Sequence, residues 1–377
     1  MCLRQIEEAL EDFRDGKMII VVDDEDRENE GDLTLAAERV TPEAINFMIR
    51  YGRGLLCLSL TPERLEELQL PLMVSENTSS FGTAFTVSIE AKHKVTTGIS
   101  PADRAATILT AIDPRTRPAD LARPGHVFPL RAKSGGVLER AGQTEAAVDL
   151  ARIAGMYPAG VICEIISDDG TMARLPQLLE FARQHALKVI SIADLIHYRL
   201  KTEKFVRQVS QSDLETEYGR FSARVFENTL TGRRHLAMVM GDVSGEEPVL
   251  VRVHRQSVLG DVFLSHAHPS GLYLRRCLKL IAARGQGVVL YLQGDSDGRQ
   301  MEAEVQTGIG WPEPAEEPAA MPREANLDYG IGAQILNSLG LRKIVLLSAH
   351  PRKFIGLQGF DLEIIRHLDI FQLQEGS

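Results

Sequence analysis

The chain has 377 residues, of which 44% are hydrophobic and 25% are charged, and its formal net charge is −10. This length exceeds what one compact core of ordinary size holds, so we expect two domains, and the composition is typical of a soluble globular protein. The acidic balance argues against nucleic acid as a partner, because phosphate contacts need a basic surface.

The sequence also argues against a membrane partner and against secretion. It contains no run of about 18 apolar residues, the length that a membrane-spanning helix needs. Its start, MCLRQIEEAL, is charged and lacks the apolar stretch of a signal peptide. The four cysteines, Cys2, Cys57, Cys163 and Cys277, are scattered and form no CxxC pair. We therefore expect reduced thiols and a cytoplasmic protein.

The first half of the chain alternates short apolar runs with helical patterns. Strands are predicted at 18–22, 55–60, 84–89, 160–166 and 188–192. Helices are predicted at 6–13, from Thr41-Pro42 onward, at 144–155 with Thr144 as the capping residue, at 175–187 and at 193–201. This alternation predicts a layered α/β (α+β) domain.

Near residues 201–204 the sequence becomes charged and loses its periodicity, so we place the domains at 1–203 and 204–377. The second half predicts another α/β domain, with strands at 221–228, 234–243, 248–254, 288–293 and 343–351 and helices at 275–285 and 328–340. Between them, residues 308–325 are rich in proline and glutamate and are expected to form a loop or linker.

An acidic run, DDEDRENEGDL, directly follows the predicted strand at 18–22. One interpretation is a solvated charged loop. The other is a shaped turn at the end of a core strand, because an arginine interrupts the acidic residues and Gly31 closes the run. Carboxylates on such a turn suit Mg²⁺, which takes few protein ligands, and they suit acid–base chemistry.

This run is similar to the signature of 3,4-dihydroxy-2-butanone 4-phosphate synthases. The segments FGTAFTVSIEAKHKVTTGISPADRAATI, RPGHVFPLRAKSGG, TEAAVDLARIAG, GVICEI and DDGTMARLPQL resemble the same family, over residues 3–200. The resemblance implies a lyase that converts D-ribulose 5-phosphate to L-3,4-dihydroxy-2-butanone 4-phosphate and formate in riboflavin biosynthesis. It also implies Mg²⁺ (or Mn²⁺) as cofactor and an α/β fold that acts as a homodimer.

The resemblance assigns roles to single residues. His126 and Glu164 match the essential histidine and glutamate, although a structural histidine in a turn and a lone acid at a strand end are the plain alternatives. Glu28 and Gln143 match the metal ligands. The residues that match substrate-binding positions are Arg27, Glu28, Asp32, Arg140, Ala141, Gly142, Gln143, Thr144 and Glu164. Gly98, Asp103 and Arg104 lie in another matching segment and receive no role, and Cys57 either lines the pocket or is a buried structural cysteine.

Gln143 departs from the family pattern, in which this position is a histidine. A glutamine carbonyl oxygen can bind Mg²⁺ but cannot titrate. A non-catalytic or regulatory riboflavin-pathway protein, or a related sugar-phosphate rearrangement, therefore remains an alternative to the synthase reaction.

The second half resembles GTP cyclohydrolase II in VRVH, GDVF, DYGIGAQIL and PRKFIGLQGF, over residues 205–370. That family binds zinc through three cysteines, and the matching positions here are Ser257, His268 and Ser270; serine is a poor zinc ligand. Its aspartate and arginine before DYGIGAQIL are Ala325 and Leu327 here. We expect no zinc and no GTP cyclohydrolase II activity, and a role in folding, dimerisation or regulation, with effector binding as a further alternative.

Overall fold

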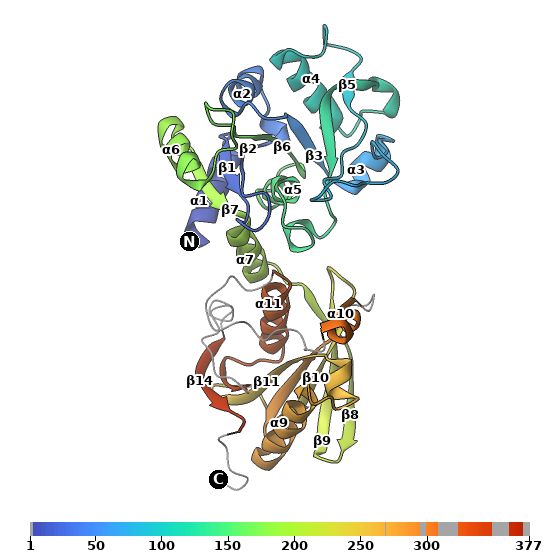
Figure 1. Cartoon of the computed structure of the whole chain (residues 1–377), viewed down its shortest axis with the longest axis vertical. Coiled ribbons are helices and arrows are strands. Elements are labelled where there is room, and N and C mark those ends of the chain that lie inside the picture. The colour runs from blue at the N-terminus through green and yellow to red at the C-terminus, as the bar shows by residue number, and fades with distance from the viewer. Residues whose placement is uncertain (1–2, 268, 295–298, 308–322, 349–361, 372–377) are drawn as a thin grey trace. The chain divides into compact units, whose positions relative to one another are not determined.

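The computed structural model describes residues 3–267, 269–294, 299–307, 323–348 and 362–371. The chain divides into two compact units, Met1–Arg199 and Leu200–Ser377. Each unit combines a sheet with helices (Figure 1), so the prediction of a two-domain α/β chain is confirmed. Across the described ranges, no helix has both the length and the apolar character that crossing a membrane requires.

The first unit is built on a mixed sheet with the strand order β4-β5-β3-β6-β2-β1-β7. β3 pairs with β5, and β1 with β7, in parallel, and the other neighbours are antiparallel. The strands are β1 (Ile19–Val22), β2 (Gly31–Ala36), β3 (Cys57–Leu60), β4 (Ile89–Ala91), β5 (Leu121–Arg131), β6 (Ala159–Glu164) and β7 (Lys188–Ser191).

Helices cover both faces of this sheet. Ile19 and Val21 of β1 belong to a core shared with α1 and α5, whereas Ile20 and Val22 face a core shared with α2, α4 and α6. This alternation is what a strand buried on both faces requires. The helices are α1 (Leu3–Arg14), α2 (Pro42–Phe47), α3 (Pro62–Glu67), α4 (Pro101–Ile112), α5 (Gln143–Ile153), α6 (Leu175–His185) and α7 (Ile192–Thr202), with the short turns η1 (Ala37–Arg39), η2 (Met48–Gly52), η3 (Pro118–Asp120) and η4 (Gly136–Leu138).

The second unit has a sheet with the order β14-β13-β11-β12-β10-β9-β8. Cys277 and Ile281 of α9 pack against Val289 on one face, and Gly332 of α11 lies against Leu290 on the other. The elements are β8 (Val206–Thr216), β9 (Gly219–Asn228), β10 (Arg234–Met240), β11 (Val249–Arg255), α8 (Val258–Asp261), α9 (Ser270–Arg284), β12 (Gly287–Leu292), α10 (Arg299–Thr307), α11 (Arg323–Ser338), β13 (Lys343–Ser348) and β14 (Glu363–Asp369).

Several sequence-based expectations need correction. The strand predicted at 84–89 is wrong, because Thr86 and Val87 donate to Pro129 and Pro71 on different segments and only Ile89–Ala91 forms a strand. The helix expected to be capped by Thr144 begins at Gln143, with Gly142 as N-cap. Of the expected linker at 308–325, residues 308–322 lie outside the described residues and 323–325 begin α11.

Candidate active site

The acidic run forms the loop of a hairpin between β1 and β2. Asp23, which directly follows β1, organises this loop through its carboxylate. Its Oδ1 accepts the Glu30 N–H at 2.8 Å, and its Oδ2 accepts the Glu28 N–H at 3.1 Å and Arg27 Nη1 at 2.8 Å. The Asp23 side chain is fully buried. The loop is therefore a shaped turn and not a solvated charged segment.

Arg27 and Glu28 face each other within this turn. Arg27 donates Nη1 to Glu28 Oε2 at 2.7 Å and Nη2 to Oε1 at 2.9 Å, a two-pronged ion pair. The Arg27 guanidinium also lies 5.6 Å from the centre of the Phe81 ring. From the start of α6, Arg174 donates to the carbonyl oxygens of Glu28 and Asn29. These contacts fix the direction of both side chains before any ligand binds.

A row of acidic side chains continues across the sheet from this turn. In the strand register Val21 of β1 lies opposite Asp32 of β2, and Asp32 lies opposite Glu164 of β6. Residues opposite one another in a sheet point to the same face, here the face covered by α5. Glu164 Oε2 accepts the Leu55 N–H at 2.8 Å, which holds this carboxylate in place.

These carboxylates are crowded and poorly solvated. Burial raises the pKa of Asp32, and the charges of Glu164, Glu28 and Glu30 add to that rise. Burial is also the main cause that raises the pKa of Glu164 and of Glu30, with the Glu28 charge acting in the same direction. Such a concentration of negative charge has the character of a cation site or an acid–base site.

Gln143 reaches the same face of the sheet from the first turn of α5. Its Nε2 donates to the Val21 carbonyl oxygen at 2.9 Å, next to Asp32 in the register. Its Oε1 is buried and has no hydrogen-bond partner in the described part of the chain. A buried acceptor without a partner is costly, so this oxygen is a natural ligand for a cation.

The residues present fit a magnesium ion. Glu28 and Gln143 offer oxygen donors beside the Asp32 and Glu164 carboxylates, and oxygen is the donor that Mg²⁺ prefers. In proteins Mg²⁺ is commonly held by one or two carboxylates together with substrate oxygens. No group of three His, Cys, Asp or Glu side chains arranged for a metal occurs within the described residues.

The loop 140–144 leads into α5, and its arginine side chain is held by hydrogen bonds. Arg140 Nη1 donates to Glu145 Oε2 at 2.7 Å, and Nη2 donates to the Phe81 carbonyl at 3.1 Å. A Cβ at Gly142 would lie 2.3 Å from Arg140 Nη1, so glycine is needed for this packing. Thr144 is buried in the first turn. A helix start beside a held arginine suits the phosphate group of a ligand.

His126 lies on β5, where its Nδ1 is 2.6 Å from Glu90 Oε2. Cys57 of β3 lies opposite both Ile162 of β6 and Phe128 of β5, so Glu164 and His126 lie beyond these residues toward the same end of the strands. Among the described residues, His126 has no hydrogen bond or ion pair with the acidic row itself. The structure thus brings Arg27, Glu28, Asp32, Gln143 and Glu164 together and places His126 at the same edge of the sheet.

Sequence reasoning missed several residues that hold this site. Asp23 and Glu30 carried a signal, because they belong to the acidic run. Arg174 and Glu90 lie in segments that resemble the family, but the sequence did not show their contacts, because each is separated from its partner by many positions.

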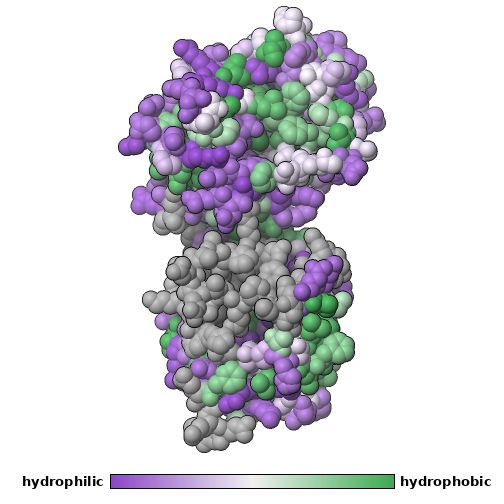
Figure 2. Space-filling model, viewed as in Figure 1, coloured by the Kyte–Doolittle hydropathy of each residue, from purple (hydrophilic) through white to green (hydrophobic). Residues whose placement is uncertain are grey.

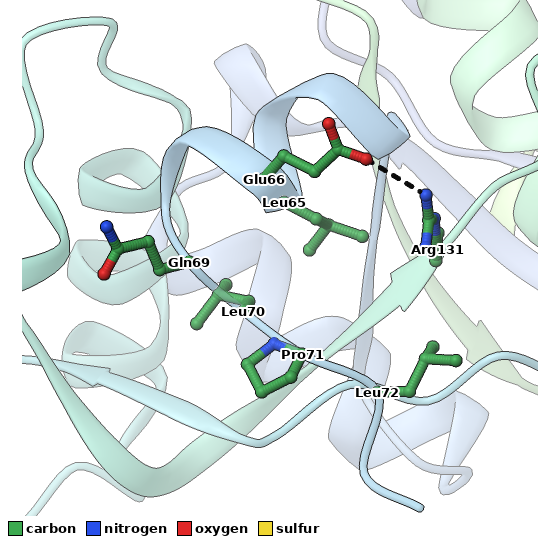
Figure 3. A pocket seen from close by; sticks show the side chains of 7 residues that line it. All are labelled: Leu65, Glu66, Gln69, Leu70, Pro71, Leu72 and Arg131. Atoms are coloured by element: carbon green, nitrogen blue, oxygen red, sulfur yellow. Dashed lines mark hydrogen bonds and ion pairs between the residues drawn. The ribbon is translucent and has the colours of Figure 1, made fainter. Parts of the chain in front are cut away.

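A surface cavity of the first unit lies elsewhere. It has a volume of about 340 Å³ and is lined by Leu65, Glu66, Gln69, Leu70, Pro71, Leu72 and Arg131 (Figure 3). Arg131 pairs with Leu60 at the ends of β5 and β3, whereas Glu164 and His126 lie at the opposite edge. Its mostly apolar lining does not suit a sugar phosphate, and no residue of the acidic row lines it.

In the second unit, two of the three positions that match zinc-binding cysteines carry serines, and both serines make hydrogen bonds. Ser257 Oγ donates to Glu304 at 3.1 Å and Ser270 Oγ donates to Asp261 at 2.8 Å. Asp261 also accepts the Ser257 N–H, Tyr291 OH and His254 Nε2 at 2.8–3.0 Å. We call these side chains, Asp261 with His254, Ser257, Ser270 and Tyr291, the Asp261 network. His268, and the side chains of Ala325 and Leu327, lie outside the described residues.

Comparison with known proteins follows the division of the chain. Residues 7–198 match the family model of 3,4-dihydroxy-2-butanone 4-phosphate synthase, and residues 207–369 match that of GTP cyclohydrolase II. Riboflavin biosynthesis protein RibBA of Aquifex aeolicus is 54% identical, with 97% of this chain and 92% of the relative covered. A 3,4-dihydroxy-2-butanone 4-phosphate synthase of Pseudomonas aeruginosa is 50% identical, with 98% of this chain and 99% of the relative covered.

Solved structures agree with the sequence relatives. RibBX, a two-domain 3,4-dihydroxy-2-butanone 4-phosphate synthase from A. baumannii, superposes with a TM-score of 0.76 at 42% identity, covering 96% of this chain and 99% of that one. A 3,4-dihydroxy-2-butanone 4-phosphate synthase in complex with two magnesium ions gives a TM-score of 0.51 at 46% identity, covering 52% of this chain and 97% of that one. The chain therefore belongs to the 3,4-dihydroxy-2-butanone 4-phosphate synthase family of riboflavin biosynthesis, in its two-domain form with a second half of the GTP cyclohydrolase II family.

Proposed function

We propose that this chain is a lyase that converts D-ribulose 5-phosphate to L-3,4-dihydroxy-2-butanone 4-phosphate and formate in riboflavin biosynthesis. The observation that carries the proposal is the row of Glu28, Asp32 and Glu164 carboxylates beside the unpartnered Gln143 Oε1. The reaction divides a five-carbon sugar phosphate into a four-carbon ketone and one-carbon formate, with no outside oxidant or reductant. It needs several proton transfers on neighbouring carbons, which this concentration of acid and base groups can supply.

The roles of the residues follow from their positions. Arg27, Asp32 and the loop Arg140–Thr144 bind the substrate, with the helix start at α5 and Arg140 holding the phosphate. Glu164 and His126 move protons to and from the reacting carbons. Glu28 and Gln143 would hold Mg²⁺ (or Mn²⁺), which would supply electrostatic stabilisation of the negative charge that develops on the substrate oxygens.

We propose the domain division 1–203 for the synthase domain and 204–377 for a cyclohydrolase-like domain without zinc and without GTP cyclohydrolase II activity. The Asp261 network supports the absence of zinc. Both serines at cysteine positions already make hydrogen bonds, and hydroxyl groups are poor zinc ligands compared with thiolates.

A homodimer is the proposed state of the molecule. Large apolar side chains are exposed on the first unit, and Figure 2 shows hydrophobic side chains gathered on the face turned to the viewer. The exposed ones near the loop that carries Phe81 are Leu72, Met73, Val74 and Phe81. Neighbouring exposed apolar side chains that form one patch mark interaction surfaces. The described cysteines, Cys57, Cys163 and Cys277, are free and buried, which is compatible with a cytoplasmic location.

The test is product identification. Purified protein is incubated with ribulose 5-phosphate and Mg²⁺, and the phosphate esters are followed by phosphorus and proton NMR. We expect the butanone phosphate from the wild-type protein and none from Glu164→Gln. A different phosphate ester would indicate a related rearrangement, and unchanged substrate would indicate a binding or regulatory protein.

A further inference from the structure

His126 stands on an irregular part of β5 that does not orient it by itself. The β4–β5 register passes from Ile89 opposite Val127 to Glu90 opposite Ala122, so residues 123–126 bulge out of the pairing. Gly125 lies so close to Ile89 that a Cβ there would meet its backbone at 2.1 Å. The His126 side chain is 46% exposed. Bulges of this kind aim a side chain away from the sheet, but a half-exposed imidazole needs a partner to keep one orientation.

Glu90 is that partner. Its Oε2 lies 2.6 Å from His126 Nδ1, and its own side chain is only 17% exposed. An ionised carboxylate can only accept hydrogen bonds, so beside it the neutral imidazole carries its proton on Nδ1 and keeps its lone pair on Nε2. A partner on one ring nitrogen thereby fixes both the tautomer and the plane of the ring, which leaves the other nitrogen ready to take a proton.

Glu90 is itself held by the loop 96–98. Gly98 has a φ of +89°, and a Cβ at this position would lie 1.9 Å from Glu90 Oε2 and 2.4 Å from Oε1. Only glycine lets the loop and the carboxylate occupy these places. On the other side, the N–H of Ala91 donates to Thr107 Oγ1 of α4 at 3.1 Å, which fastens β4 next to Glu90.

Asp103, in the first turn of α4, clamps that loop. Its carboxylate accepts Thr96 N–H at 3.0 Å, Thr96 Oγ1 at 2.7 Å and Gly98 N–H at 3.0 Å. Asp103 N–H in turn donates to the N-cap Ser100 at 3.1 Å. These groups form a continuous series: Asp103 fixes the loop, Gly98 of the loop lies directly against the Glu90 carboxylate, and Glu90 contacts His126.

We propose that Glu90 is the positioning residue of His126, and that Gly98 and Asp103 act on the reaction through Glu90. The proposal rests on the proposed synthase function, in which His126 transfers protons, and it gives Gly98 and Asp103 the roles that sequence reasoning left open. Glu90 does not touch the reacting carbons. Its loss should therefore lower kcat and leave KM for ribulose 5-phosphate nearly unchanged.

The experiment uses the full chain with Glu90→Ala, Gly98→Ala and both changes together. We expect Glu90→Ala to lower kcat about 10- to 100-fold, the range seen when a partner that orients a functional histidine is removed. Gly98→Ala should also lower kcat. The kcat of the double variant should be no lower than that of Glu90→Ala alone, because both changes act through one group. Glu66→Gln is the matched control: Glu66 also pairs with a β5 side chain, Arg131, at 3.2 Å, and its loss should leave kcat unchanged.

A second readout does not depend on activity. Nitrogen-15 NMR of the histidine rings, with His126→Gln to assign the signal, should show the Nδ1-protonated tautomer in the wild type and a shift toward the Nε2-protonated form in Glu90→Ala. A wild-type kcat in Glu90→Ala, or the same tautomer in both proteins, would overturn the proposal. If the wild type fails to turn over ribulose 5-phosphate while the tautomer still depends on Glu90, the proposed function fails and the positioning stands.

Discussion

Gln143 is the residue on which the metal requirement of the proposed reaction depends most directly. Its amide nitrogen is held by the Val21 carbonyl oxygen, and its buried carbonyl oxygen points to no described partner. The side chain is therefore fixed in one orientation with the oxygen available. A glutamine oxygen binds a divalent cation without titrating, whereas the imidazole that the family has at this position can also take up and release a proton.

We expect Gln143→His to raise turnover and to shift the Mg²⁺ concentration needed for half-maximal rate, each on the order of tenfold, as is typical when one ligand interaction of a metal site changes. Glu28→Ala should abolish activity with either residue at 143, because it removes the anionic ligand. A Mg²⁺ titration of the four proteins measures both effects.

If Gln143→His leaves the rate and the Mg²⁺ dependence unchanged while Glu28→Ala is inactive, Gln143 does not bind the metal. The placement of the 140–144 loop at the metal would then be wrong.

Asp261 is the residue of the second unit on which local stability depends most directly, because four donors converge on its carboxylate. Removing an acceptor leaves buried donors unsatisfied at about 1–3 kcal/mol each, so Asp261→Ala should lower the free energy of unfolding of this unit by about 3 kcal/mol or more. Urea unfolding measures the change.

Asp242→Ala is the control for Asp261, since Asp242 is exposed and its carboxylate accepts local hydrogen bonds from Ser244, while its bond from Gln286 goes to the backbone carbonyl and survives the change. It should change stability by less than about 1 kcal/mol. A metal chelator should leave the unfolding of the wild type unchanged, and a marked loss of stability with chelator would show that a metal, not the Asp261 network, holds this region.

At the scale of elements, the sequence predicted the buried apolar strands and the amphipathic helices well. It failed where a strand contains or follows residue types that are unusual in strands, such as proline and runs of acidic residues. β5 contains Pro124 and Pro129, which argue against a strand, yet Pro129 lies opposite Leu58 of β3, and its carbonyl oxygen accepts the Thr86 N–H. β2 was hidden by the acidic run at its start. Only its pairing with β1 shows that Asp32 is a buried strand residue.

β10 carries a buried histidine that should make the second unit sensitive to acid. Burial lowers the pKa of His235 to about 4, and the nearby Arg233 charge acts in the same direction. Its Nδ1 accepts the Gln293 N–H at 3.1 Å, so the ring is neutral in the folded protein. The folded pKa lies below the unfolded value near 6.5, so stability is present above about pH 6.5 and is lost as the pH falls toward 4.

Between pH 7 and pH 5 this residue should cost the unit about 2 kcal/mol of unfolding free energy. Hydrogen exchange at β9 and β10 amides, corrected for its intrinsic pH dependence, measures the loss. His235→Gln keeps an acceptor for Gln293 and cannot titrate. Its unfolding free energy should therefore fall by about 2 kcal/mol less than that of the wild type between pH 7 and pH 5. Equal slopes in the two proteins would show that His235 is not buried as a neutral ring.

At the scale of the whole molecule, the first unit carries its own core and the complete acidic row, so it should work without the second. A chain shortened to residues 1–203 should fold and keep the synthase activity. A chain shortened to residues 1–191 should not, because it loses α7 and with it Arg199, whose Nη1 lies 2.8 Å from Asp149 in the core. An unpaired buried carboxylate costs about 3–5 kcal/mol. Circular dichroism and the rate of formate release measure both outcomes.

The family signature made the acidic loop, His126, the 140–144 loop and Glu164 predictable from the sequence. It could not show that Asp32, Glu164 and Val21 share one row, because that depends on the pairing of three strands from separate parts of the chain. Nor could it reveal Glu90, which reaches His126 from another strand. In the second half, the lost cysteines were visible in the sequence, but the hydrogen bonds to Asp261 that replace them were not.

Formate release is the one measurement that tests the account most directly, because each of the two family activities produces formate from a different substrate. The full chain is supplied with Mg²⁺ and either ribulose 5-phosphate or GTP, and formate is quantified over time beside the Glu164→Gln variant. We expect formate from ribulose 5-phosphate with the wild type only, and none from GTP with either protein. Formate from GTP, or its absence from ribulose 5-phosphate, would contradict the account.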